Sequence, residues 1–234
     1  MKTVFNLSIF ALLIVAFSSC DKTSPTITNG YSLSTINKVS IQCACDANIY
    51  SGATQKVELT GSEHLLDRAE VYVDGTTLIV KMKPGIYNNM DIVANITIPT
   101  VEFVEVKGSG NIWVNDFSGL GDLSLNVSGS GNISTGNLDL GQNKLITDIS
   151  GSGDVSVSGV AASSYIKISG SGNYAGFGMP VDVSDVKVSG SGNIDVTVNN
   201  SLSVDISGSG NVSYKGQPTV NTEITGSGSV INAN

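Results

Sequence analysis

Residues 186–198 read VKVSGSGNIDVTV, and this short stretch decides the fold. Apolar residues alternate with polar ones on both sides of a Gly-Ser-Gly-Asn segment, and the apolar ones are β-branched. Such alternation indicates two short strands, each with one buried and one solvated face. Glycine tolerates a positive φ and the close approach of another backbone, so the triplet suits a corner. Val188 and Ile194 have the same parity, so glycines facing inward on a continuous strand are the alternative.

The same triplet recurs seven times, at intervals of 18 to 22 residues. Two short strands and their corners in each interval make one coil of a β-solenoid, in which every strand pairs in parallel with its copy in the next coil, ~4.8 Å away. We therefore predict an all-β, single-stranded parallel β-helix with coils of about 18–22 residues. The triplets begin at Gly108, Gly129, Gly151, Gly170, Gly190, Gly208 and Gly226.

A polar residue follows each triplet. Stacked coils would align these side chains as a ladder in which each amide donates to its neighbour's carbonyl, so we interpret the row as structural. A polar stripe that contacts a glycan is the functional alternative. A calcium-binding nonapeptide repeat is not indicated, because its period is near nine and it needs an Asp in every copy. The predicted ladder comprises Asn111, Asn132, Asp154, Asn173, Asn193 and Asn211.

Residues 36–107 lack the triplet but alternate in the same way. We predict that they form atypical N-terminal rungs that cap the solenoid, ahead of the repeat rungs of residues 108–234. Within them, Asp74-Gly75 between two apolar runs is typical of a hairpin turn. Residues 230–234 show no cap, which leaves an open strand edge for self-association.

The first residues of the chain predict export and anchoring. The apolar run of residues 4–17 is too short to span a bilayer of ~30 Å but suits the core of a signal peptide. It leads into FSSC at residues 17–20, which resembles the lipobox of bacterial lipoproteins, where the cysteine receives the lipid. We predict a signal peptide in residues 1–19, lipidation of Cys20 and a tether over residues 20–35. The alternative is an ordinary signal peptide with an incidental cysteine.

Cys43 and Cys45 lie in VSIQCAC at residues 39–45, where every second residue is apolar. Both thiols are therefore expected on the inward face of a strand. Two buried free thiols are the simplest interpretation. A Cys43–Cys45 bridge or a redox pair is the alternative, which a compartment outside the cytoplasm would permit. No second thiol pair completes a zinc site.

Composition excludes several classes of function. The chain of 234 residues has a formal net charge of −8, with one arginine, Arg68, and one histidine, His64. A nucleic-acid surface needs clustered Lys and Arg, so no nucleic-acid partner is predicted. A multi-histidine metal site is excluded by counting, and we assign no metal, cofactor or catalytic residue.

A polysaccharide-cleaving β-helix, a lyase or a hydrolase, is the enzymatic alternative, because right-handed β-helices often cleave glycans. Glycoside hydrolysis usually needs two carboxylates at a defined separation. Asp148, Asp185, Asp195 and Asp205 alternate with inward-facing residues, so we expect them to point outward as a solvated face. Asp195 and Asp205 are the pair that adjacent coils could bring together.

A polysaccharide-binding module would use exposed aromatic side chains. The aromatic residues of the repeats share no position, and Tyr174 stands where other copies have Ile or Val, so we place Tyr174 in the core. The set is Trp113, Tyr165, Tyr174, Phe177 and Tyr214.

Several segments together resemble a known family. EHLLD at 63–67, DGTTLIV at 74–80 and VEVKGSGNI at 104–112, with the lipobox, are similar to the putative auto-transporter adhesin, head GIN domain family over about residues 36–215. The resemblance implies a right-handed parallel β-helix on a lipoprotein or secreted protein of a bacterium with an outer membrane. It supplies no catalytic or binding residues.

We therefore expect a non-enzymatic outer-membrane lipoprotein, on the periplasmic or the surface face, that presents a rigid acidic solenoid for adhesion or surface structure. The expected partners are the membrane, through the lipid, and a glycan or extracellular-matrix ligand. A polysaccharide-binding or polysaccharide-cleaving protein is the alternative.

Overall fold

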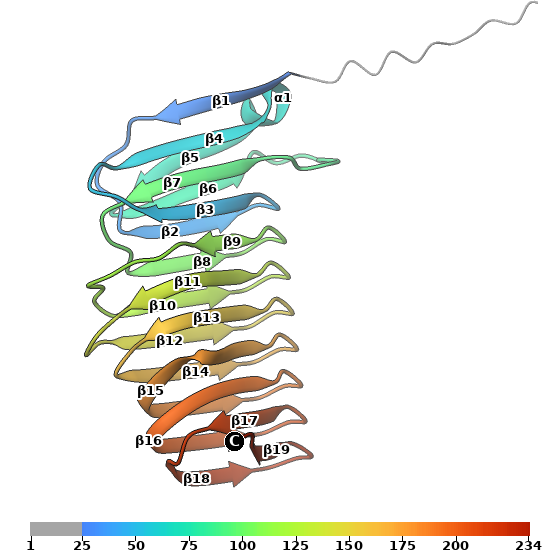
Figure 1. The fold of residues 1–234 in the computed structure, drawn as a ribbon. Coiled ribbons are helices and arrows are strands. Elements are labelled where there is room, and N and C mark those ends of the chain that lie inside the picture. Colours follow the sequence, from blue (N-terminus) through green and yellow to red (C-terminus); the bar gives the residue numbers. More distant parts are fainter. Residues whose placement is uncertain (1–24) are drawn as a thin grey trace, which may run out of the picture.

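The computed structural model describes residues 25–234, which form a tall stack of β-coils with one short helix, α1 (Glu63–Leu66) (Figure 1). The segment predicted to be a signal peptide, residues 1–19, and the predicted lipidation site Cys20 lie outside the described residues. The predicted all-β parallel solenoid is confirmed. Each coil contributes one strand to each of two layers, whose inward faces enclose the core.

Neighbouring strands of the first layer follow one another along the stack, and their order is not the order of the sequence. From the N-terminal end the layer contains β1 (Thr26–Tyr31), β4 (Lys56–Ser62), β7 (Val93–Ile98), β3 (Asp46–Ser51), β9 (Ile112–Val114), β11 (Ile133–Asp139), β13 (Val155–Val160), the first halves of β15 (Tyr174–Val188) and β16 (Ile194–Ile206), β17 (Asn211–Lys215) and β19 (Ser229–Asn232).

The second layer is joined to the first by β15 and β16, which are long enough to contribute to both. It contains β5 (Ala69–Asp74), β6 (Thr77–Met82), β2 (Lys38–Gln42), β8 (Phe103–Val106), β10 (Leu123–Val127), β12 (Lys144–Ile149), β14 (Ser163–Ile168), the second halves of β15 and β16, and β18 (Thr219–Ile224).

Columns of β-branched side chains fill the core. Ile168, Val188 and Ile206 are paired in register on successive strands of the second layer, and each is at most 1% exposed. Burying one such side chain stabilises the fold by roughly 1.5–3 kcal/mol. Tyr174 is buried as predicted, in register with Val155 and Ile194. The alternation in the sequence thus corresponds to the inside and outside of the stack.

The Gly-Ser-Gly triplets form the tight corners on one side of the stack (Figure 1). Glycine is needed there because the corners touch. A Cβ placed on Gly192 would lie 2.0 Å from the carbonyl oxygen of Gly172, one coil earlier. The φ of Gly192 is outside the left-handed region, so backbone contact, and not a positive φ, excludes a side chain. The two possibilities left by the sequence are settled in favour of a corner.

Hydrogen bonds join each corner to the one before it. The backbone N–H groups of Ser209 and Gly210 both donate to the carbonyl of Gly190, at 2.9 and 3.2 Å. The same pattern joins the corners that begin at Gly129, Gly151, Gly170 and Gly226 to their predecessors. The corners therefore continue the strand ladder around the edge of the solenoid instead of interrupting it.

Cys43-Ala44-Cys45 is the first corner of this series. A Cβ on Gly108 or Gly110 would collide with the carbonyl oxygen of Cys43 or Cys45, respectively, which places the cysteines in the two glycine positions. The cysteines form a disulfide, so the interpretation as free thiols is wrong, although both residues are buried as expected. The cysteine side chains fit because the next coil toward the N-terminal end of the stack has no tight corner. Its strands β6 and β7 are joined by a long loop, residues 83–92.

The N-terminal end departs from simple stacking. The β2–β3 coil is the first in the sequence but lies between β6–β7 and β8–β9. After β3 the chain therefore forms the N-terminal end of the stack and then returns past β2–β3 to β8–β9. β4 runs antiparallel to both β1 and β7, and β5 and β6 form the hairpin predicted at Asp74-Gly75. β1 lies within residues 20–35, which the sequence analysis assigned to a tether.

At the other end of the stack, β18 and β19 each pair with a strand on one side only. Ile224 on β18 is 42% exposed although its register partner Ile206 is fully buried. Two strand edges are therefore open at the C-terminal end of the described structure.

Candidate functional site

The predicted polar residues lie in one row along the outside of the first layer, immediately after the corners. The side-chain amides of Asn132, Asn173, Asn193 and Asn211 each donate to a side-chain oxygen one coil earlier, at 2.8 to 3.2 Å. The Asp154 backbone N–H donates to Asn132 Oδ1 at 2.8 Å, and Asp154 Oδ1 accepts from Asn173.

The row extends one residue beyond the prediction. Asp46 Oδ1 accepts from both the backbone N–H and the side-chain amide of Asn111, at 2.8 and 3.2 Å. Asp46 follows Cys43-Ala44-Cys45 as Asn111 follows Gly108-Ser109-Gly110, and this correspondence was the signal that could have revealed it. Because these oxygens are already engaged along the stack, the row organises the corners.

The outward-facing aspartates are scattered. Asp195 lies on the first layer and Asp205 on the second, so the stack does not bring them together as a carboxylate pair. Asp148 forms an ion pair with Lys167 at 3.7 Å, and Asp205 is in register with Lys187. An exposed pair of this kind is worth about 0–1 kcal/mol. Asp148 and Asp205 therefore belong to a solvated, charge-mixed face of the second layer.

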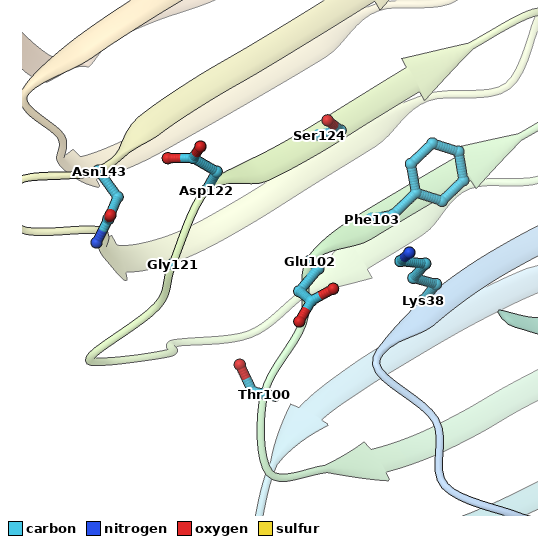
Figure 2. Close-up of a pocket in the computed structure, with 8 residues that line it drawn as sticks. All are labelled: Lys38, Thr100, Glu102, Phe103, Gly121, Asp122, Ser124 and Asn143. Atoms are coloured by element: carbon cyan, nitrogen blue, oxygen red, sulfur yellow. The ribbon is translucent and has the colours of Figure 1, made fainter. Parts of the chain in front are cut away.

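An open groove of about 500 Å³ crosses the second layer near its N-terminal end (Figure 2). Figure 2 shows the ring of Phe103 beside Lys38, with Glu102 on the segment that leads into β8 and Asp122 just before β10. Its lining comprises Lys38, Thr100, Glu102, Phe103, Gly121, Asp122, Ser124 and Asn143.

Internal hydrogen bonds hold part of the polar lining of this groove in place. Asp122 Oδ1 accepts from the backbone N–H of Lys144 at 2.8 Å, and Asn143 Nδ2 donates to the carbonyls of Leu120 and Leu140 at 3.0 Å. These bonds fix two of the lining side chains. None of the lining residues is a histidine or a cysteine, so the groove offers hydrogen bonds, charge and one aromatic face.

A second groove, of about 260 Å³, lies on the first layer of the same coils. It is lined by Asp46, Ala47, Asn48, Val93, Asn111, Ile112, Trp113 and Ser134. Trp113 is the only tryptophan of the chain and is 44% exposed. Tyr50 on the neighbouring strand is 40% exposed. Sequence reasoning recorded Trp113 without placing it and passed over Tyr50, which lies outside the triplet repeats.

Residues 25–234 offer neither a cluster of metal ligands nor a helix that could span a membrane. No group of three or more His, Cys, Asp or Glu side chains in this part of the chain could hold a metal ion. Nor does any helix there have the length and apolar character needed to cross a bilayer.

Comparison with protein families gives a clear match. Residues 36–218 match the model of the family described as putative auto-transporter adhesin, head GIN domain. The chain belongs to this family. The resemblance to the head GIN domain family was predicted over about residues 36–215, nearly the same part of the chain, so that prediction is confirmed. No match was found among curated proteins.

Solved structures with the same fold include proteins of Bacteroides and Parabacteroides species. A putative adhesin of Bacteroides fragilis superposes on this head GIN domain chain with a TM-score of 0.79 at 22% identity, covering 89% of this chain and 97% of its own. A putative lipid binding protein of Parabacteroides distasonis gives 0.71 at 21% identity, covering 89% and 97%. A putative adhesin of Parabacteroides merdae gives 0.68 at 22%, covering 89% and 96%. At these identities the likeness establishes the fold.

Proposed function

We propose that the chain is a non-enzymatic adhesin of the cell envelope that binds a glycan or extracellular-matrix ligand through the N-terminal coils of a rigid solenoid. Membership of the head GIN domain family supports a surface or envelope location. The observation that carries the proposal is the position of the two grooves. They lie on opposite layers of the stack, and the coils β2–β3, β8–β9 and β10–β11 supply most of both linings; further hollows of about 260 and 150 Å³ lie along the second layer between β8 and β16.

The rest of the stack supports a scaffold role. Between β12 and β19 the corners and the inward residues repeat from coil to coil, and most outward residues are polar or charged, with Ile146, Tyr165 and Val183 among the exceptions. Parallel coils joined by backbone hydrogen bonds resist bending, so the stack would keep the two grooves in a fixed position relative to each other.

The proposed lipid at Cys20 would give the stack a direction. Five residues lie between Cys20 and the start of β1 at Thr26, and the extended chain that joins the two spans at most about 20 Å. β1 ends the first layer, at the opposite end from β18 and β19 (Figure 1). An anchored protein would therefore hold its N-terminal coils near the outer membrane, with the C-terminal end distal and its open edges available to a second copy.

A polysaccharide-cleaving enzyme is the competing function. It is disfavoured because Asp195 and Asp205 lie on different layers and Asp148 is paired with Lys167. The two carboxylates of the larger groove, Glu102 and Asp122, are the ones to test for turnover.

The test expresses the full chain, including its N-terminal segment, in a deletion strain of the source bacterium. Attachment of the cells to surfaces coated with mucin, fibronectin or collagen is counted beside an empty-vector strain. We expect expression to increase attachment to at least one surface. Equal attachment of both strains to all three would overturn the adhesive role. Release of reducing ends or unsaturated uronates from pectin, alginate or chondroitin sulfate would establish the enzyme instead.

A further inference from the structure

Trp113 stands in an outward-facing column whose other side chains are smaller, most of them polar, and which ends at Ile231. Its outward-facing register partners on the neighbouring strands are Asn48 and Ser134. Further along the same column stand Ser156, Ala175 and other residues smaller than tryptophan. Packing therefore does not explain the indole, because the coils fold with a serine there. Tryptophan combines a large apolar face with a polar N–H, a combination that is enriched at binding interfaces, and this ring stays 44% exposed.

The indole is held in place. Trp113 Nε1 donates to Asn115 Oδ1 at 3.2 Å. Asn115 is itself fixed, because its backbone N–H and its side-chain amide both donate to the carbonyl of Ile49, at 2.8 and 3.2 Å. A ring that is fixed before a ligand arrives loses little conformational entropy on binding.

Polar side chains border the ring on the side of the groove. Asn48 Nδ2 donates to Asn95 Oδ1 at 3.2 Å, which orients the Asn48 amide. Asp46 uses Oδ1 for Asn111, and since a carboxylate has about four lone-pair sites on its two oxygens, Oδ2 can accept from a ligand hydroxyl. Ser134 adds a hydroxyl that both donates and accepts.

We propose that the Trp113 groove, defined by Asp46, Asn48, Asn111, Trp113 and Ser134, is a saccharide-binding subsite that takes one neutral pyranose ring. The axial C–H bonds of a pyranose stack on the negative face of an indole, and its hydroxyls bond to carboxylate, amide and hydroxyl groups at the ring edge. The groove of about 260 Å³ is below the usual range of about 300–1,000 Å³ for drug-sized ligands, so further sugar units would extend across the layer.

Charge restricts the class of sugar. The lining of this groove includes one carboxylate, Asp46, and no lysine or arginine. The whole chain has a net charge of −8. A uronate or sialylated sugar would be repelled, whereas a neutral hexose or N-acetylhexosamine would not.

The test uses the sole tryptophan as the reporter. The full chain, purified in a detergent without sugar groups, is titrated with hexasaccharides of β-1,4-glucose, β-1,4-N-acetylglucosamine, β-1,4-mannose and β-1,4-xylose. We expect at least one of them to shift Trp113 emission saturably, and calorimetry to give the same affinity. Hexagalacturonate is titrated in parallel. The absence of any saturable shift with all four neutral hexasaccharides, or a saturable shift with hexagalacturonate alone, would overturn the subsite.

Two variants separate the subsite from general surface effects. Trp113→Ser installs the residue that the next coil has at this position, so the fold should persist, and binding measured by calorimetry should weaken at least tenfold. Tyr72→Ser, at a tyrosine of the second layer that is 40% exposed, should bind like the unmodified chain. Equal affinity of Trp113→Ser and the unmodified chain would refute the inference.

The inference rests on the proposed adhesive function, and the two fail separately. If cells with the Trp113→Ser chain attach as well as cells with the unmodified chain, while the deletion strain does not attach, the adhesive role stands and the subsite is refuted. If the deletion strain itself attaches normally, the adhesive role is refuted, and saccharide binding is judged by the titration alone.

Discussion

Replacing Gly192 by alanine should destabilise the solenoid, because the corners leave no space for one methyl group. The new Cβ would lie 2.0 Å from the carbonyl oxygen of Gly172 and 2.8 Å from Cγ2 of Ile168, whereas ordinary contact begins at 3.4 Å. Relieving the shorter contact requires a displacement of more than 1 Å between two coils. That movement would also break the 3.0 Å bond from Ser191 N–H to the Gly170 carbonyl.

The expected cost follows from these contacts. Overpacking a close-packed site costs about 1–3 kcal/mol, and each lost hydrogen bond about 0.5–1.5 kcal/mol. With one or two bonds lost, the free energy of unfolding should fall by about 1.5–6 kcal/mol. This is a large share of the roughly 5–15 kcal/mol typical of a domain. Gly192→Val adds a branched side chain to the same contact and should cost more.

Urea unfolding followed by far-UV circular dichroism measures the effect. The matched control is Gly121→Ala, because a Cβ on Gly121 meets no atom within 4 Å and its φ is outside the left-handed region. Its midpoint should stay close to that of the unmodified chain or rise slightly. If Gly192→Ala unfolds at the same urea concentration as Gly121→Ala, contact between corners is not what requires glycine.

Four further outcomes are expected. Cys20→Ala should move the protein from the membrane fraction to the soluble fraction without changing its circular dichroism, and continued sedimentation with membranes would contradict lipidation. In that variant, denatured without reductant, a thiol reagent should find no free thiol, and replacing Cys43 and Cys45 by alanine should cost about 1–2 kcal/mol in urea unfolding; free thiols before reduction would refute the bridge. Asn173→Ala should cost about 1 kcal/mol in the same assay, because it removes one member of the hydrogen-bonded row, and an unchanged midpoint would show that the row adds nothing. Burial raises the pKa of Tyr174 well above its ordinary value of about 10, so the stability that this protonated phenol contributes is full below pH 10 and is lost as the pH rises further. Tyr174→Phe should therefore reduce the fall in the urea midpoint between pH 9 and pH 11. An equal fall in the variant and the unmodified chain would contradict this expectation.

The repeat rungs could be predicted from the sequence because both of their signals are local. Alternation assigns Val188 and Ile194 to the inside, and the fixed spacing of the triplets places one corner on another. The hydrogen-bonded row follows from the same spacing, since residues at equivalent corner positions must be neighbours in a parallel stack.

The N-terminal coils could not be predicted in the same way. Alternation specifies which face of a strand is buried but not which strand lies beside it, so the position of β2–β3 between β6–β7 and β8–β9 has no local signal. The binding surfaces share this difficulty. Trp113 was visible as a residue, but its groove depends on Asp46 and Asn48, which precede it by about sixty residues and are brought alongside by this non-sequential order.

The contacts between corners are directional, and this determines how the protein can change in length. Each glycine of a Gly-Ser-Gly corner is constrained by the corner before it, because a Cβ on that glycine would collide with a carbonyl oxygen of the preceding corner. The first corner has no such predecessor, which is why Cys43 and Cys45 fit there and would not fit at Gly190 or Gly192. A coil can therefore be duplicated or deleted between β12 and β18 without altering either groove. Natural or engineered relatives can vary their height by whole coils of about 4.8 Å while the coils that line the two grooves, and the disulfide, stay the same.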